Sequence, residues 1–185
     1  MSRSRILSGA ATLAVAGALY ALPAPALYAQ SAPRMKRVSL ENGHLSFLVP
    51  SNFRALTESE IKFKFPRQRP PKVVYANAAQ SVSIAVNFTI RFPSLATAKS
   101  VFDKILPQNA PSFHWIKDGY STINGKSWVD LEFTTAAIDT TIHNNELFAL
   151  LPDESVILNL NATVESYPKA APLFRAVKNS LTIRP

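Results

Sequence analysis

Apolar and polar residues alternate along most of the chain after Val38, and this two-residue period constrains the fold more than any other feature. The stretch 82–90 is the clearest case, because Val, Ile, Val, Phe and Ile alternate there with Ser, Ala, Asn and Thr. Successive side chains of a strand point to opposite faces, so this pattern predicts a strand with one apolar face. Similar patterns predict strands at 38–41, 44–49, 73–76, 115–123, 128–133, 142–151 and 156–164.

Tight turns join these strands in pairs. Asn42-Gly43 and Asn124-Gly125 are dipeptides that accept the positive φ angles of a two-residue hairpin turn, and 152–155 is a cluster of turn formers. Three hairpins without strand–helix–strand alternation favour an antiparallel sheet over a parallel nucleotide-binding sheet. The predicted fold class is α+β, with a central antiparallel sheet of about six to seven strands flanked by helices.

Three short helices are expected between the strands. Thr57-Glu58-Ser59-Glu60 matches a capping box and predicts a helix to about Phe65. A second helix is expected from Ser94 to Pro107, which should end it. A third should begin near Ser166 and Pro168, with Pro172 tolerable only in its first turn.

The first 29 residues have the order of a secretory signal peptide. Arg3 and Arg5 precede an apolar run, 6–22, and a small-residue tail allows cleavage after Ala29, or alternatively after Ala26. Residues 30–37 are expected to form a flexible leader, and 38–185 a single domain. The chain has no cysteine, which excludes a lipoprotein anchor and disulfides. A periplasmic or secreted location is therefore predicted, with no transmembrane segment after cleavage.

The charge balance is basic. The formal net charge is +8, and Arg3 and Arg5 contribute two of these charges, so the processed protein would carry +6. In an exported protein, this excess favours anionic envelope components or acidic protein partners, and nucleic acid is excluded for lack of access. The excess could equally serve only to keep the protein soluble.

The order of these elements resembles a known superfamily. The resemblance rests on Val49-Pro50 before the capped helix 57–65, on 73–77 leading into 81–84, on Asn124-Gly125-Lys126-Ser127-Trp128, and on Tyr167-Pro168 followed by 180–183. Together they are similar to the PsbP/DcrB-like superfamily of small exported or organelle-lumen domains. The resemblance implies an antiparallel sheet with helices on both faces, used as a binding or accessory module. It implies no shared active site.

The parts of an enzyme are missing from the sequence. His44, His114 and His143 are too scattered for a short-spaced zinc motif. Asp139 and His143 would lie more than about 12 Å apart on one strand face. The glycines after residue 37 are too few for a nucleophile elbow or a phosphate-binding loop. The sequence therefore predicts no enzyme, no metal site and no cofactor.

The basic loop after the first helix is the best candidate for partner binding. Arg67, Arg69 and Lys72 lie among prolines, and Lys62 and Lys64 precede them. Guanidinium groups held semi-rigidly could bind phosphate or carboxylate. The alternative is an ordinary solvated loop.

A second candidate is the strand face of Trp128, Asp130 and Glu132. An aromatic ring beside two carboxylates could meet a sugar or a cation. The alternative is a face that is exposed to solvent or half-covered by a helix.

Together these observations predict a periplasmic, non-enzymatic binding or accessory protein that contacts a protein or an anionic envelope component. One alternative is a carrier of a small apolar or amphipathic ligand held between sheet and helices. An unrecognised hydrolase is a third possibility. The sequence does not indicate the oligomeric state.

Overall fold

The computed structural model describes residues 33–66 and 69–184. The predicted signal peptide with both cleavage sites lies outside them, as does Arg67. The strands are β1 (Met35–Leu40), β2 (Leu45–Pro50), β3 (Arg54–Ala55), β4 (Val73–Ala76), β5 (Val82–Ile90), β6 (His114–Ile123), β7 (Lys126–Ala136), β8 (Thr141–Leu150), β9 (Glu154–Thr163) and β10 (Thr182–Ile183). The helices are α1 (Glu58–Lys64), α2 (Leu95–Asn109) and α3 (Tyr167–Ser180), with a short 3-10 helix at Glu41–Gly43.

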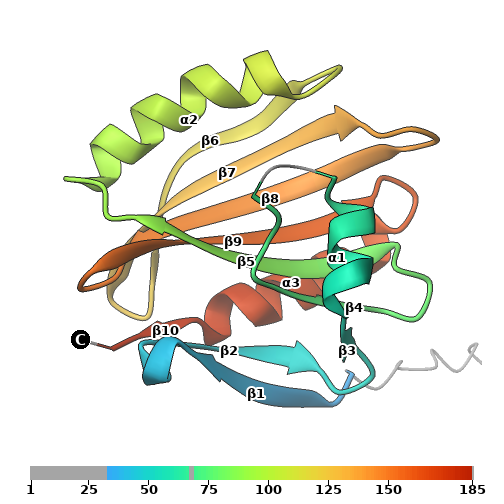
Figure 1. The fold of residues 1–185 in the computed structure, drawn as a ribbon, viewed down its shortest axis with the longest axis horizontal. Coiled ribbons are helices and arrows are strands. Elements are labelled where there is room, and N and C mark those ends of the chain that lie inside the picture. Colours follow the sequence, from blue (N-terminus) through green and yellow to red (C-terminus); the bar gives the residue numbers. More distant parts are fainter. Residues whose placement is uncertain (1–32, 67–68, 185) are drawn as a thin grey trace, which may run out of the picture. The chain divides into compact units, whose positions relative to one another are not determined.

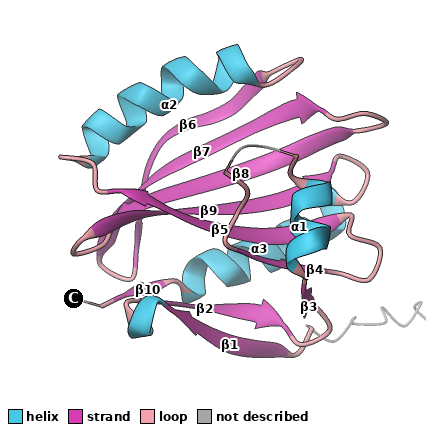
Figure 2. Cartoon of the chain, viewed as in Figure 1, coloured by secondary structure: helices cyan, strands magenta, loops and turns pink. Residues whose placement is uncertain are grey.

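A seven-stranded antiparallel sheet forms the centre of this domain, with strand order β3-β4-β5-β9-β8-β7-β6. The helices α1 and α2 pack on one face of the sheet, and α3 packs on the other (Figure 1). Helices therefore cover both faces of one antiparallel sheet, as Figure 2 shows by secondary structure. This confirms the predicted α+β class.

The first hairpin does not join this sheet. β1 and β2 pair with each other, and β2 pairs on its other edge with β10, which makes a separate three-stranded sheet. The helix α3 lies between the two sheets (Figure 1). The expectation of one sheet was wrong on this point. The third strand of the small sheet, β10, comes from the far end of the chain and has only two residues, too few to leave a periodic pattern in the sequence.

Alternation places the core on both sides of the large sheet. On the α3 side, Leu158 and Leu160 of β9 are completely buried and share one apolar cluster with Phe174 and Val177 of α3. On the other side, Phe102 of α2 contacts Phe148 of β8 edge to face, with ring centroids 5.4 Å apart. The strand pattern read from the sequence therefore encodes two apolar layers.

The structure departs from the sequence prediction most clearly at the start of β1 and at two prolines. β1 begins at Met35, within the segment assigned to the flexible leader, because Met35 pairs with Pro50. Pro107 lies inside α2 instead of ending it. It lacks an N–H, but it stands in the last turn, where little helix follows to be disrupted. Pro172 lies beyond the first turn of α3, where a lost backbone hydrogen bond is compensated by packing of the buried α3 face.

Candidate functional site

A row of amide side chains occupies the face of the large sheet that α1 and α2 cover only in part. β5, β9 and β8 are neighbouring internal strands, and the residues that alternate with their apolar core positions point to this face. Residues opposite each other in the ladders are Asn87 and Ile157, Asn159 and Glu146, and Asn161 and Asn144. We call the surface that Asn87, Asn144, Glu146, Asn159 and Asn161 line the asparagine groove.

The groove contains two adjoining hollows. One, of about 200 Å³, lies over the amides beside Phe65 at the end of α1 and Pro71 in the following loop. The other, of about 580 Å³, lies at the end of β5. Arg69, Asn87 and Ile157 line both, so the two hollows are immediate neighbours.

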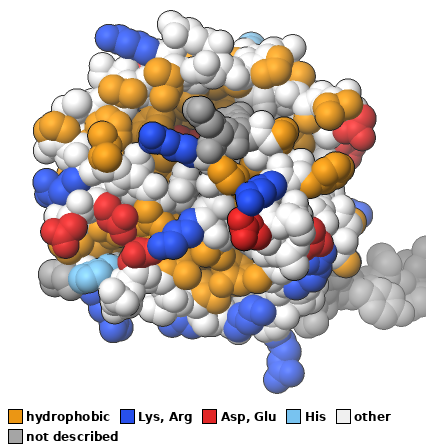
Figure 3. Space-filling model, in the orientation of Figure 1, with side chains coloured by type: hydrophobic (Ala, Val, Ile, Leu, Met, Phe, Trp, Pro, Cys, Tyr) orange, Lys and Arg blue, Asp and Glu red, His pale blue; other side chains and the backbone are white. Residues whose placement is uncertain are grey.

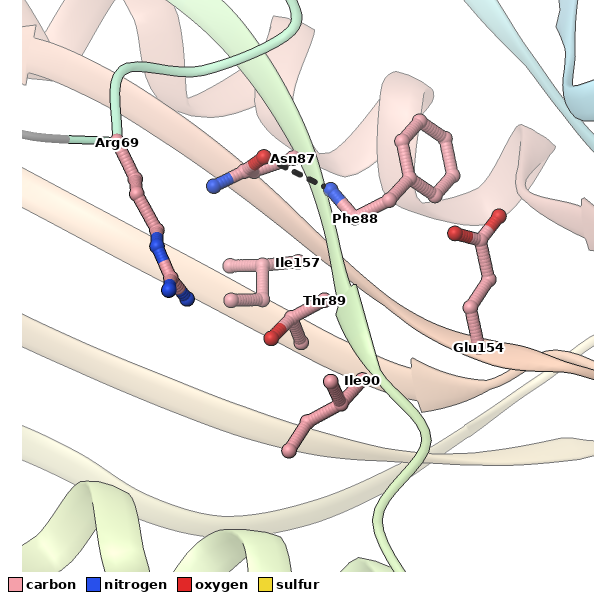
Figure 4. A pocket seen from close by; sticks show the side chains of 7 residues that line it. All are labelled: Arg69, Asn87, Phe88, Thr89, Ile90, Glu154 and Ile157. Atoms are coloured by element: carbon pink, nitrogen blue, oxygen red, sulfur yellow. Dashed lines mark hydrogen bonds between the residues drawn. The ribbon is translucent and has the colours of Figure 1, made fainter.

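Figure 4 shows how these side chains lie at the end of β5. Arg69 descends from its loop beside Asn87, Ile157 and Thr89, and Phe88 and Glu154 lie on the other side of the β5 ribbon. The side chain of Asn87 accepts a hydrogen bond from the backbone N–H of Phe88 (2.9 Å). Its amide nitrogen has no hydrogen bond to the described residues, so it can donate to a molecule in the groove.

The hydrogen bonds within the groove are incomplete. Asn159 Nδ2 donates to Glu146 Oε2 (3.1 Å), and Asn144 Nδ2 donates to Thr135 Oγ1 (3.2 Å). The buried oxygens Oδ1 of Asn159 and Oδ1 of Asn161 accept no hydrogen bond from the described residues. An unpaired buried polar atom costs about 1–3 kcal/mol, so an apolar floor would be the more stable choice here.

The predicted basic cluster is largely neutralised by neighbouring groups. Lys62 pairs with Glu58 (2.6 Å), Lys72 pairs with Glu41 (2.5 Å), and Lys64 donates to the Gln80 carbonyl (2.8 Å). Burial lowers the pKa of Lys64. Figure 3 shows Lys and Arg side chains spread over this face, several of them beside Asp or Glu.

Arg69 differs from these lysines. It is exposed, and no hydrogen bond or ion pair joins it to another described residue. Of the four described members of the predicted cluster, it alone lines the groove.

The predicted face of Trp128, Asp130 and Glu132 lies beneath α3. Trp128 and Asp130 are 1% and 0% exposed, so a ligand could reach them only if α3 moved away. Lys178 of α3 donates to both carboxylate oxygens of Asp130 (3.0 and 2.9 Å), Asn145 Nδ2 donates to Oδ1 (2.9 Å), and Lys117 also binds this carboxylate. Burial favours a higher pKa, but these hydrogen bonds outweigh it and lower the pKa of Asp130 to about 2.

Glu132 joins a second buried group under α3. Its Oε1 lies 2.6 Å from His143 Nε2 and accepts a hydrogen bond from the Tyr167 hydroxyl (2.8 Å). The rings of His143 and Tyr167 are stacked, with centroids 3.4 Å apart. Burial and the bond to Glu132 raise the pKa of Tyr167 to about 12. His143 is buried, so this acid–imidazole pair is closed to a substrate.

Neither a metal site nor a membrane span stands out in the part of the chain that the structure describes. No group of three or more His, Asp or Glu side chains is placed there to hold a metal ion. No helix within the same residues combines the length and the apolar character needed to cross a bilayer.

Sequence reasoning missed the asparagine groove. The sequence does contain a trace of the groove, because polar residues with long side chains recur at every second position of two strands. Asn159 and Asn161 alternate with buried leucines, and Asn144 and Glu146 are likewise two residues apart. Polar positions of this kind are usually interpreted as solvent-facing, and only the position of α1 and its following loop makes them the floor of a depression.

The arrangement of strands and helices in this domain is also found in other proteins of known structure. The fold is PsbP-like, as the sequence resemblance predicted. No family model matches the sequence, and no curated protein is similar to it in sequence.

Three solved structures show the similarity in fold. Cyanobacterial PsbP (CyanoP) from Synechocystis has a TM-score of 0.62 at 13% identity, covering 84% of this chain and 96% of its own. LpqN of Mycobacterium tuberculosis, described as involved in cell envelope biogenesis, has a TM-score of 0.54 at 17% identity, covering 82% and 92%. The Ran-binding protein Mog1p of Saccharomyces cerevisiae has a TM-score of 0.52 at 14% identity, covering 82% and 96%. At these identities the likeness extends to the fold alone.

Proposed function

We propose that the protein is a non-enzymatic binding or accessory protein of the cell envelope, and that it holds an anionic partner at the asparagine groove. The observation that supports this most is Arg69, an exposed guanidinium without a partner among the described residues, at the rim of a depression lined with amides. A guanidinium offers a planar fork of donors that suits carboxylate and phosphate groups. The partner is a protein or another anionic envelope component.

The proposed location rests on the sequence of the first 29 residues and on the absence of cysteine. The involvement of LpqN in cell envelope biogenesis agrees with this location. Mog1p, a Ran-binding protein, illustrates that the fold is used elsewhere to bind a protein. Both comparisons support a binding role without identifying the partner.

A binding role also agrees with where the reactive groups lie. The nearest arrangement to a catalytic one among the described residues is Glu132, His143 and Tyr167, and it is closed beneath α3. The groove itself presents amides, the carboxylates of Glu146 and Glu154, and Arg69. The alternative of an apolar carrier finds no support on the α3 side, where Phe174, Val177 and Leu158 fill one packed cluster.

Site-specific photocrosslinking tests the proposal. A photoreactive residue replaces Thr89 in the groove, and a second version carries it at Arg175, an exposed position on α3. We expect envelope components to be captured from position 89 and not from position 175. The substitution Arg69→Glu should reduce this capture about tenfold, since it replaces an attraction with a repulsion. Equal capture from both positions, or capture unaffected by Arg69→Glu, would contradict the proposal.

A further inference from the structure

Most of the backbone beneath the groove is already hydrogen-bonded within the sheet. β9 and β8 are paired on both edges, and β5 is paired with β9 along its whole length and with β4 along part of it. A peptide that binds by adding a strand needs a free sheet edge, and in this surface only the end of β5 at 87–90, beyond its pairing with β4, offers one. Over β9 and β8, where most of the amides lie, recognition must therefore use side chains.

The side chains in question match hydroxyl groups. An amide carries two donors and one acceptor, a carboxylate only accepts, and a hydroxyl both donates and accepts. The amides of Asn87, Asn144, Asn159 and Asn161 thus place donors and acceptors side by side along three adjacent strands. A molecule with hydroxyls at regular intervals satisfies such a surface.

The walls of the groove suit the remaining parts of such a molecule. Phe65 and Ile157 offer apolar surface for the C–H faces of a sugar ring, and Arg69 offers a charge-assisted bond to an acidic substituent. The larger hollow, about 580 Å³, lies in the range of small-molecule sites, and its open form suits a chain that passes through.

We infer that the asparagine groove binds a carbohydrate chain with acidic substituents, its hydroxyls on the amides and its carboxylate or phosphate on Arg69. This inference rests on the proposed function and names the chemistry of the partner. The retained unpaired oxygens of Asn159 and Asn161 support it, because polar groups that reduce stability are expected where a ligand uses them.

Isothermal titration with defined oligosaccharides tests the inference on the processed protein. The probes are a hexamer of galacturonate, glucose 6-phosphate, neutral maltohexaose and inorganic phosphate. We expect the galacturonate hexamer or glucose 6-phosphate to bind about tenfold or more tightly than maltohexaose and inorganic phosphate, and the tighter of the two identifies the acidic group. Acidic sugars that bind no better than maltohexaose or phosphate would overturn the inference.

Variants separate recognition by the groove from simple charge attraction. Arg69→Glu should weaken the acidic sugar about tenfold, whereas Arg175→Glu, which changes the same charge on the opposite face, should leave its affinity unchanged. Asn159→Leu should weaken binding by a similar factor. Asn87→Ala provides a second amide variant in case Asn159→Leu does not fold, because the side-chain hydrogen bond of Asn87 within the described residues is to its own neighbour, Phe88.

Loss of binding in Arg69→Glu with full binding in both amide variants would overturn the inference, because it would show charge attraction without sugar recognition. The inference would also be overturned if the photoreactive residue at position 89 captures a partner while the same protein shows no affinity for acidic sugars. That last result would leave the proposed binding function standing.

Discussion

Asp130 is completely buried, and its carboxylate connects separate parts of the domain. Lys117 reaches it from β6, Asn145 from β8 and Lys178 from α3. Charges of this kind rarely add much stability compared with an apolar residue, but removal of one partner leaves the others unpaired. The network therefore fixes the position of α3 on the sheet.

Asp130→Asn should lower the free energy of unfolding by about 3 kcal/mol, because Lys178 would lose its counter-charge in a mostly buried setting. Urea denaturation followed by fluorescence measures the change. Asp153→Asn removes an exposed carboxylate and should change stability by less than about 0.5 kcal/mol. Equal stabilities of the two variants would show that the network contributes nothing.

The same carboxylate makes stability depend on pH. Its pKa is about 2 in the folded protein and near 3.8 in the unfolded chain, so the unfolded chain binds more protons between these values. The contribution of Asp130 should be complete above about pH 4 and should be lost as the pH falls towards 2. In urea titrations over this range, the wild type should lose about 2 kcal/mol more than Asp130→Asn. Parallel losses in the two proteins would contradict this account.

At the scale of elements, α1 is a short helix that depends on its first turn. Thr57 Oγ1 accepts a hydrogen bond from the Glu60 backbone N–H (3.3 Å), and the Glu60 carboxylate accepts one from the Thr57 N–H (2.8 Å). Arg54 also binds this carboxylate, and these hydrogen bonds lower the pKa of Glu60 to about 2. The capping box stabilises the first turn of α1. It thereby helps to position the loop that follows α1 and carries Arg69.

Thr57→Ala should destabilise the domain by about 1 kcal/mol, because it removes the acceptor of the first turn. Hydrogen exchange at the amides of α1 should accelerate more than exchange in β9. Thr140→Ala, at an exposed turn, serves as the control and should leave the exchange of α1 unchanged. Uniform acceleration in all elements would indicate that α1 does not open independently.

The elements that the sequence predicts well are those with local signals. Asn124-Gly125 and the alternation on either side of it predict the β6–β7 hairpin, and the capping box predicts the start of α1. Both α2 and α3 were predicted, but not the continuation of α2 past Pro107 or the place of Pro172 beyond the first turn of α3, because propensity ranks proline as a helix breaker and tertiary packing overrides it. The pairing of β2 with β10 depends on residues far apart in sequence and leaves no local trace.

At the scale of the whole domain, the small sheet and the large sheet share one core. Phe47 of β2 is completely buried and belongs to the same apolar cluster as Phe174 of α3 and Leu158 of β9. The domain should therefore unfold as a single cooperative unit.

Phe47→Ala should lower the free energy of unfolding by about 3–5 kcal/mol, because it leaves a cavity between the small sheet and α3. Fluorescence of the buried Trp128 and far-ultraviolet circular dichroism should still report the same denaturation midpoint. Ile138→Ala, at an exposed turn, is the control and should change little. Two separate midpoints in Phe47→Ala would show that the small sheet folds on its own.

The candidate site was less predictable than the fold. Arg69 was identified from the density of basic residues, but the same reasoning also selected Lys62 and Lys72, which are held by Glu58 and Glu41. Whether a lysine forms an ion pair depends on which acidic side chain the fold brings beside it, and a hydropathy pattern does not predict that neighbour. The amides were passed over because polar residues in a strand normally face water.

Groove positions and core positions alternate one by one along β9, where Asn159 and Asn161 alternate with Leu158, Leu160 and Ala162 of the apolar cluster that includes α3. Inserting or deleting a single residue in this strand would send amides into the apolar layer and leucines into the groove. Substitutions at the groove positions can therefore change which ligand the groove binds without disturbing the core. Insertions and deletions must be confined to the turns at the strand ends.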